Sequence, residues 1–473
     1  MWETTGGPFR GLGTVFQPIT ESETPGIADS PQNSGLRLLV QQDTYSERNR
    51  GGKMHDSQSF HLGNGILIGF LIAVLVSAAC AMPSLAEEPI KIGVIDALSG
   101  PARAAFGEPA LLGWQMVAQE INTKGGINGR RIDIIPRDSQ FSDSKALAAA
   151  EQLIQKEGVH FLGGTSNSAS ALAISNLAKE NRMLFMVHVA RSERITGEKG
   201  HRYVFAACPN TIIEGKSGAS YAKYRKYLKW FIIGEDYEYG HSIARNFWEE
   251  LQKLQPKVEK VGEVWVPLGT ADYSSNMQEI IDKNPTGVVA AFGASGMARF
   301  MSQAVKSGVL ERIHVFLNLM ADPALNAQLS ETPVGENALG STSYLWYYPN
   351  SPENKEFVRQ YNEFMKKRGE SDPVPPGSSF FAGYCSARFI TDAIRKAGAV
   401  DTERVIDALE GMTIETPIGP ITMRPCDHQA TTPVYWGRMQ RGELRGLPII
   451  LAPYSVRAED LLPKCDEITR LRK

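Results

Sequence analysis

A short polar loop offers the most chemistry in this sequence. Residues 163–168 read Gly-Gly-Thr-Ser-Asn-Ser and stand directly before a predicted helix over residues 169–180. Hydroxyl groups and the free N–H groups at a helix start carry partial positive charge, which suits a bound carboxylate. The same residue types are also the ordinary caps of a helix, so capping alone would explain them. The loop is therefore either an anion-binding site or a plain helix start.

Aromatic residues are the second notable feature. Aromatic walls with a few fixed polar groups are what a cleft for a small molecule needs. Core packing is the alternative for each aromatic residue, and it explains Phe292, Phe380 and Phe381 equally well. Six aromatic residues stand at or near predicted strand-to-helix loops or a helix start: Phe106, Tyr237, Tyr239, Phe292, Phe380 and Phe381.

Motifs for catalysis are incomplete. Residues 215–217 read Gly-Lys-Ser, but Asn210 stands where a phosphate-binding loop requires its first glycine. Residues 293–296 resemble a nucleophile elbow, but Met297 stands where that motif needs glycine. His188 follows a buried strand and could either line a site or be a structural histidine. No combination of serine, histidine and acid is evident, so we predict no enzyme, no catalytic residue and no cofactor.

Alternating strands and helices must position these residues. Residues 90–138 predict a strand, a loop, a helix, a turn and a second strand, which is the start of an α/β domain. Residues 90–97 are the first strand, Glu108 and Pro109 favour a helix start, and residues 125–126, Gly-Gly, end that helix. The loop after the first strand is where open parallel sheets bind ligands.

The alternation continues in two series. Strands alternating with helices predict parallel sheets, and two series of this size predict two lobes. A third part contains a strand at residues 340–347 and helices at 353–368, 380–397 and 401–409, and 435–439 is a late strand. The other predicted strands lie at residues 131–135, 159–162, 183–189, 229–233, 261–266, 287–292 and 313–319.

The composition is that of an ordinary globular protein. The chain has 473 residues, of which 42% are hydrophobic and 22% charged, and its formal net charge is −2. This length suits two or three domains. The near-neutral charge argues against nucleic acid as a main partner. No Cys-x-x-Cys or clustered Cys/His spacing is present, so we predict no metal site.

The N-terminal region differs from the rest. Residues 1–53 show no helical or strand period, and we expect this extension to be disordered or absent from the natural product, which would then start at Met54. Residues 66–81 are almost wholly apolar and small residues follow, so residues 54–86 are predicted to be a signal peptide cleaved after Ala86. This predicts a periplasmic protein. A retained membrane anchor is the alternative, and lipidation at Cys80 is a minor option.

The remaining cysteines permit disulfides in an exported chain. After cleavage four are left, an even number. Cys426 and Cys465 lie in a loop-rich tail, and we predict that they form a disulfide. Cys208 and Cys385 stand in apolar surroundings and are expected to be buried thiols.

With these residues in view, the chain resembles the periplasmic branched-chain amino acid-binding protein family, whose members are substrate-binding components of ABC importers. The most specific match is residues 90–107, IKIGVIDALSGPARAAFG, followed by INTKGGINGRRIDII at 121–135. The DYEYG loop at 236–240 and Asp-His-Gln at 427–429 ahead of PVYWGRM also match. The resemblance covers roughly residues 88–440.

The resemblance implies the type I periplasmic-binding fold, in which two parallel-sheet, Rossmann-like lobes close on a ligand between them. It implies delivery of a small organic ligand to ABC permease and ATPase subunits, with membrane contact only through the permease or a retained signal segment. By this resemblance, lobe 1 is residues 87–207 plus 341–424 and lobe 2 is 208–340 plus 425–473. Three crossovers join them, near residues 206–209, 340–344 and 424–428.

Ligand-binding residues also follow from the resemblance, position by position. Phe106 takes the place of an aromatic residue that covers the ligand, and Tyr239 that of a tyrosine facing the cleft from the second lobe. Ala294 and Ser295 belong to the next loop of that lobe. The two loops that hold the ligand carboxylate contain Ser166, Ser168, Ala169, Ala190 and Arg191.

Two departures from the family pattern bear on the ligand. Met320 stands where members that bind amino acids have an acidic residue for the ammonium group, and Asp322 is close but out of register. Arg191 replaces a small hydroxyl residue and could clamp an acid in a bidentate pair. A branched-chain amino acid therefore competes with an amide, an aromatic carboxylate or another organic acid. The alternative function is a ligand-sensing receptor domain, which would normally carry a signalling domain or a further membrane span.

Overall fold

A computed structural model describes residues 87–327, 335, 337–442 and 446–473 of the chain. The predicted N-terminal extension, residues 1–53, and the predicted signal peptide, residues 54–86, lie outside these described residues. Within the described ranges, no helix has both the length and the apolar character needed to cross a membrane.

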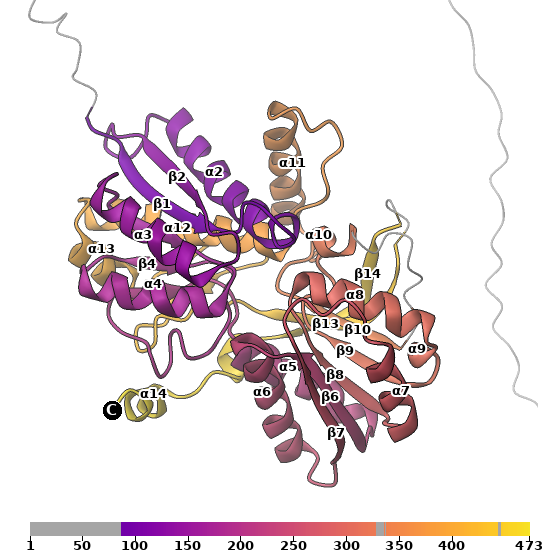
Figure 1. The fold of residues 1–473 in the computed structure, drawn as a ribbon. Coiled ribbons are helices and arrows are strands. Elements are labelled where there is room, and N and C mark those ends of the chain that lie inside the picture. The colour runs from indigo at the N-terminus through magenta and orange to yellow at the C-terminus, as the bar shows by residue number, and fades with distance from the viewer. Residues whose placement is uncertain (1–86, 328–334, 336, 443–445) are drawn as a thin grey trace, which may run out of the picture. The chain divides into compact units, whose positions relative to one another are not determined.

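The first sheet has five parallel strands in the order β2-β1-β3-β4-β5, of which β1, β2 and β4 are labelled in Figure 1. Strand β1 is almost wholly buried because helices cover both faces of a parallel sheet. The strands are β1 (Ile90–Asp96), β2 (Ile132–Asp138), β3 (Phe161–Gly164), β4 (Phe185–Val187) and β5 (Val204–Ala206). The helical elements are η1 (Arg103–Gly107), α2 (Glu108–Thr123), α3 (Asp143–Gln155) and α4 (Ser168–Glu180), joined later by α11 (Pro352–Lys367), α12 (Ser378–Ala397) and α13 (Thr402–Leu409).

The second sheet has seven strands in the order β14-β13-β10-β9-β8-β6-β7. Strands β6 to β10 pair in parallel, whereas β13 and β14 are antiparallel additions at one edge. The strands are β6 (Lys229–Glu235), β7 (Glu259–Val266), β8 (Gly287–Ala291), β9 (His314–Leu317), β10 (Ala338–Thr342), β13 (Val434–Arg441) and β14 (Pro448–Val456). The helical elements are α5 (Thr211–Ala222), η2 (Lys223–Arg225), α6 (Glu238–Leu254), α7 (Ser274–Lys283), α8 (Ala294–Lys306), α9 (Val309–Arg312) and α10 (Pro323–Asn326).

The predicted alternation of strands and helices is confirmed, with differences at some element ends. Strand β6 runs to Glu235, two residues beyond its predicted end, and α8 begins at Ala294, where a loop through Gly296 was expected. Strand β14 was not predicted. It contains Pro453, and a proline is tolerated there because β14 is the edge strand of its sheet.

The chain crosses between the two sheets three times. The crossings follow β5, β10 and the short ribbon β11 (Thr413–Ile414)–β12 (Ile421–Thr422), close to the three predicted positions. The first and third crossings are hydrogen-bonded side by side. The Ala206 N–H donates to the carbonyl of His428 (3.0 Å), and the Ala430 N–H donates to the carbonyl of Ala206 (2.9 Å).

The C-terminal end of the chain is tied to the third crossing. A disulfide joins Cys426 to Cys465, the pair expected from the sequence, with 5.6 Å between their Cα atoms. Cys465 begins helix α14 (Cys465–Leu471), which follows the turn η4 (Ala458–Asp460). Cys208 and Cys385 are free and buried, and burial raises the pKa of the Cys208 thiol to about 11.

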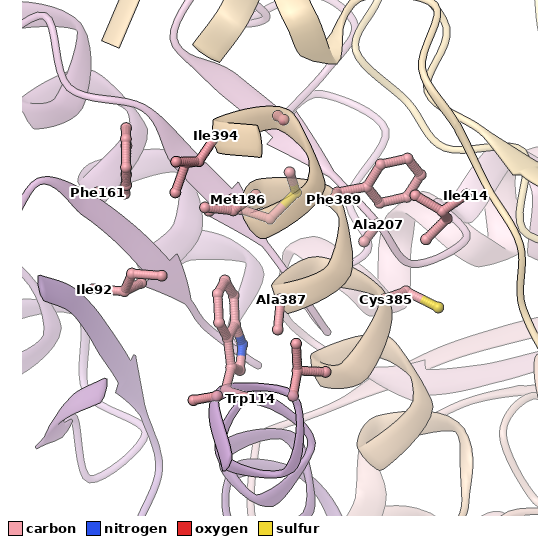
Figure 2. Packing of buried hydrophobic residues seen from close by; sticks show 14 of the residues in the cluster. Ile92, Trp114, Phe161, Met186, Ala207, Cys385, Ala387, Phe389, Ile394 and Ile414 are labelled. Atoms are coloured by element: carbon pink, nitrogen blue, oxygen red, sulfur yellow. The ribbon is translucent and has the colours of Figure 1, made fainter. Parts of the chain in front are cut away.

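The core under the first sheet is built around Trp114, which is fully buried. Figure 2 shows its ring pointing from α2 into the space between Ile92 and Ala387 of α12. A side chain at Gly163 on β3 would collide with this indole ring. The absence of a side chain at Gly163 thus makes room for the large ring of Trp114, as close packing requires.

Helices α2 and α12 touch through their backbones. A methyl group added at Gly383 would collide with the carbonyl of Ala110, and one added at Gly113 would collide with Phe380 and Tyr384 backbone atoms. Two glycines facing opposite helices therefore set the distance between them. The turn η1, directly before α2, is also tied to the start of α12, because the Ser379 hydroxyl donates to the carbonyl of Ala105 (3.0 Å).

Replacing Gly383 by alanine should lower the free energy of unfolding by about 1–3 kcal/mol, because the new methyl group forces the two helices apart. Equilibrium unfolding in urea measures this loss. The matched control is Arg395→Ala on the exposed side of the same helix, which should stay within about 0.5 kcal/mol of the parent. Equal stability of both variants would contradict the close helix contact.

Candidate functional site

A cavity lies where the carboxyl ends of the parallel strands of both sheets meet. We call it the inner chamber, and its cavity volume is about 20 Å³. Each wall residue follows the end of a strand, as expected for ligand sites of parallel sheets. The lining residues are Phe106, Phe141, Ser166, Ser168, Val189, Arg191, Tyr237, Tyr239, Gly293 and Leu319.

Five of the nine predicted ligand-binding residues line the inner chamber together: Phe106, Ser166, Ser168, Arg191 and Tyr239. Ala169 and Ala190 are not among the lining residues. The Ala169 N–H donates to the side chain of Asn167 (2.8 Å), so helix capping uses the donor that was expected to face an anion. The Ala190 N–H donates to the Thr165 carbonyl (2.8 Å).

The loop after β8 differs from the prediction. Ala294 and Ser295 form the first turn of α8, and their side chains lie outside the description. Gly293, directly before them, lines the chamber instead. Phe292 and Phe381 are buried in the hydrophobic cores, which decides for core packing.

A buried hydrogen-bond network fixes the polar loop. Asp96, at the end of β1, accepts from the Ser166 N–H (3.0 Å) and from the Ser166 hydroxyl. Its other oxygen lies 2.6 Å from His188 Nε2. Trp114 Nε1 donates to His188 Nδ1 (3.0 Å), so the ring proton is on Nε2 and is donated to Asp96. His188 is therefore a structural histidine behind the site, not a wall of it.

Arg191 is the charged group of the inner chamber. Its side chain is 2% exposed, and its Nη1 donates to Glu214 (2.6 Å). The other oxygen of Glu214 accepts from the Tyr239 hydroxyl (3.3 Å). Burial lowers the pKa of Arg191, but Glu214 and, to a smaller extent, Cys208, Tyr239 and Asp322 together raise the pKa above its ordinary value.

One edge of the Arg191 guanidinium is open. Its Nε and Nη2 atoms are buried and have no hydrogen-bond partner among the described residues. The Ser168 hydroxyl accepts from the backbone N–H of Arg191 (3.3 Å) and Ser192 (3.2 Å), which fixes the loop that carries the arginine. Two neighbouring N–H donors on a planar group match the two oxygens of a carboxylate.

Neither Met320 nor Asp322 supplies the ligand-facing carboxylate that the sequence comparison associates with binding of an ammonium group. Met320 is fully buried in the core. Asp322 accepts from the Ser378 N–H (2.6 Å) and hydroxyl (2.7 Å), so it anchors the start of α12. The inner chamber, as far as the described residues line it, contains Arg191 and no carboxylate.

Sequence reasoning missed several walls. Phe141 follows the carboxyl end of β2, and the same strand-end rule that selected Phe106 would have found it. Tyr237 was noted as an aromatic residue but not placed in the binding set. Glu214 lies inside α5 and meets Arg191 only after folding, so no local pattern marks it. In the described part of the chain, no three His, Cys, Asp or Glu residues are grouped to hold a metal ion.

Comparisons with known proteins agree with this geometry. A family model described as periplasmic binding protein matches residues 89–443. The Leu/Ile/Val-binding protein homolog 7 of Brucella suis biovar 1 (strain 1330) is 27% identical over 360 residues, which cover 73% of this chain and 86% of that relative.

Solved structures agree in fold. A solute binding protein of an ABC transporter from Rhodopseudomonas palustris BisB5, in complex with 3,4-dihydroxybenzoic acid, has a TM-score of 0.69 at 23% identity, covering 78% of this chain and 98% of its own. The leucine binding protein LivK from Thermotoga maritima MSB8 has a TM-score of 0.68 at 23% identity, covering 79% of this chain and 100% of its own. At these identities the likeness concerns the fold alone, and that fold is the type I periplasmic-binding architecture.

Replacing Asp96 by asparagine should lower the free energy of unfolding by about 1–3 kcal/mol. The new amide nitrogen would face either the Ser166 N–H or the His188 Nε2 proton, so two donors would meet in a buried place. Urea unfolding measures the effect, and Asp133→Asn on the exposed face of β2 is the control. If Asp96→Asn proved as stable as the control, the assigned histidine tautomer would be wrong.

Proposed function

This chain belongs to the periplasmic binding protein family, and we propose that it captures a small organic acid for an ABC importer. Proteins of this family bind ligands and are not enzymes, and the proposed role involves no reaction at the site. The proteins reported above include a Leu/Ile/Val-binding protein homolog, a leucine binding protein and a protein in complex with 3,4-dihydroxybenzoic acid. These names support amino acids and aromatic acids as the ligand classes to consider.

The two unpartnered N–H donors of Arg191 help to decide between amino acids and organic acids as the ligand. A ligand carboxylate placed against Nε and Nη2 would accept hydrogen bonds from the two guanidinium donors that the described residues leave without a partner. An α-amino acid would also bring an ammonium group, for which the described walls of the inner chamber offer no carboxylate. Phe106, Phe141 and Tyr237 suit a flat apolar body. An aromatic or other organic acid therefore fits better than an amino acid.

Closure of the two sheets around the ligand is the proposed mechanism. Arg191 comes from the first sheet and Tyr239 from the second, so one ligand contacts both only when the halves meet, and binding favours the closed form. At the rim, Glu238 of α6 accepts from the Ser192 hydroxyl (2.6 Å) and from Arg194 (3.0 Å). These contacts cross from one half to the other in the closed form.

The proposed setting is the periplasm. A cleaved signal peptide would export the chain, and the permease and ATPase subunits of the importer would be its partners. We take as the two moving bodies residues 87–207 with 341–424 and residues 208–340 with 425–473.

A thermal-shift screen of the exported protein tests the ligand class. Amino acids, amides and aromatic acids are compared at equal concentrations. A ligand present at 100 times its dissociation constant should add about 2.7 kcal/mol to the free energy of unfolding. We expect aromatic or other organic acids to raise the melting temperature most. Stabilisation by branched-chain amino acids alone would refute the organic-acid assignment.

Replacing Arg191 by lysine should weaken binding of the acid found in that screen by about 10- to 100-fold, because a lysine cannot form the bidentate pair. Lysine keeps a positive charge beside Glu214, so the fold should survive. Titration calorimetry gives the affinity, and Arg395→Lys on the surface of α12 is the control. An acid that binds the lysine variant and the parent equally well would show that Arg191 does not contact it.

A further inference from the structure

A second cavity adjoins the inner chamber. We call it the outer chamber, and its cavity volume is about 120 Å³. The two chambers share four wall residues, so they are neighbouring parts of one cleft. The shared residues are Phe106, Phe141, Tyr237 and Gly293, and the outer chamber adds Pro101, Ala102, Glu235, Leu268 and Gly269.

Glu235 is the one ionisable wall residue, apart from tyrosine, of the outer chamber among the described residues. It is the last residue of β6 and is 1% exposed. One oxygen accepts from the Gly293 N–H (2.9 Å), and the other has only a long contact with the Gly269 N–H (3.4 Å). No lysine, arginine or histidine of the described chain forms an ion pair with it.

The buried carboxylate of Glu235 can accept more hydrogen bonds than the protein gives it. Two carboxylate oxygens can accept about four hydrogen bonds, and Glu235 receives two from the protein. Burial raises the pKa of Glu235, and the two backbone N–H groups and the charge of Arg299 oppose this shift only in part. A side chain at Gly296 would collide with the carboxylate, so the small residues at the start of α8 leave room for it.

We propose that Glu235 is a second recognition point, which accepts a hydrogen bond from a donor group on the ligand. Building on the proposed function, the ligand would then be an elongated acid. Its carboxylate binds Arg191 in the inner chamber, and a hydroxyl or ammonium group at its other end binds Glu235 in the outer chamber. Phe106, Phe141 and Tyr237, which border both chambers, enclose the part of the ligand between these two ends.

The distribution of charge across the cleft supports this polarity. Arg191 and Glu235 lie in different chambers, and each has hydrogen-bonding capacity that the described residues leave unused. A ligand with an acid at one end and a donor at the other would satisfy both groups. An acid without a donor would satisfy Arg191 alone and leave Glu235 desolvated, which disfavours it relative to its hydroxylated counterpart.

Matched ligand pairs test the proposal on the exported protein. 4-Hydroxybenzoate is compared with benzoate, and 4-hydroxyphenylacetate with phenylacetate, so that each pair differs by one hydroxyl group. 4-(Aminomethyl)benzoate supplies the ammonium donor. In the parent protein, at least one donor-bearing acid should bind about 10- to 100-fold more tightly than its counterpart without the donor.

Variants of Glu235 identify the group responsible. Glu235→Ala should abolish the preference for the donor while the acid without the donor keeps its affinity within about threefold. Glu235→Gln keeps an acceptor oxygen and the shape of the side chain. It should therefore retain part of a preference for a hydroxyl group but lose most of a preference for an ammonium group. Glu249→Gln, on the exposed face of α6, is the control and should change nothing.

The outcomes separate this inference from the proposed function. If acids bind through Arg191 but no pair shows a donor preference, or if the preference survives in Glu235→Ala, the role of Glu235 is refuted and the proposed function stands. If no acid in the panel binds, the proposed function fails and this inference fails with it.

Discussion

The site depends on a buried guanidinium group whose charge is paired but whose hydrogen-bond donors the protein satisfies only in part. Arg191 is taken out of water and meets one carboxylate, Glu214, which is itself held by the Tyr239 hydroxyl. Removing either partner of such a pair leaves an uncompensated buried charge, which costs several kcal/mol. The pair also spans the two halves, because Arg191 follows β4 and Glu214 and Tyr239 belong to α5 and α6. The orientation of the guanidinium is thus set by contacts between the two halves.

A second buried network connects the core to the site. Trp114 packs between α2, α12 and the first sheet, and its indole N–H fixes the proton position on His188. His188 then donates to Asp96, which holds both polar groups of Ser166 at the chamber wall. The side chains of Trp114, His188 and Asp96 therefore connect the hydrophobic core to the loop that carries Ser166 through consecutive hydrogen bonds. A mutation at the core end of this chain is expected to act on binding as well as on stability.

The strand-helix alternation could be predicted because apolar strands and capped helices are local patterns. The start of α2 at Glu108 and the chamber position of Phe106 follow from such patterns and from the family resemblance. The partners of buried charges could not be predicted, because Glu214 is 23 residues from Arg191 and becomes its neighbour only through folding. Glu235 was assigned to a loop because β6 was expected to stop two residues earlier. Ala169 shows the opposite error, since a donor that looks free in the sequence is occupied by Asn167.

The paired crossings limit how the halves can move. Besides the Ala206 bonds, Gln429 donates to the carbonyl of Cys208 (2.6 Å) and the Thr432 hydroxyl to that of Ala207 (2.7 Å), while the rings of His428 and Phe205 stack 3.9 Å apart. Two cross-linked chain segments resist stretching and sliding far better than one, yet they can still twist or fold along their length. Any change in the angle between the two halves must therefore bend or twist these two joined segments together, along with the crossing that follows β10. The Cys426–Cys465 disulfide adds a covalent link beside the third crossing, so breaking it would leave that segment held by hydrogen bonds and packing alone.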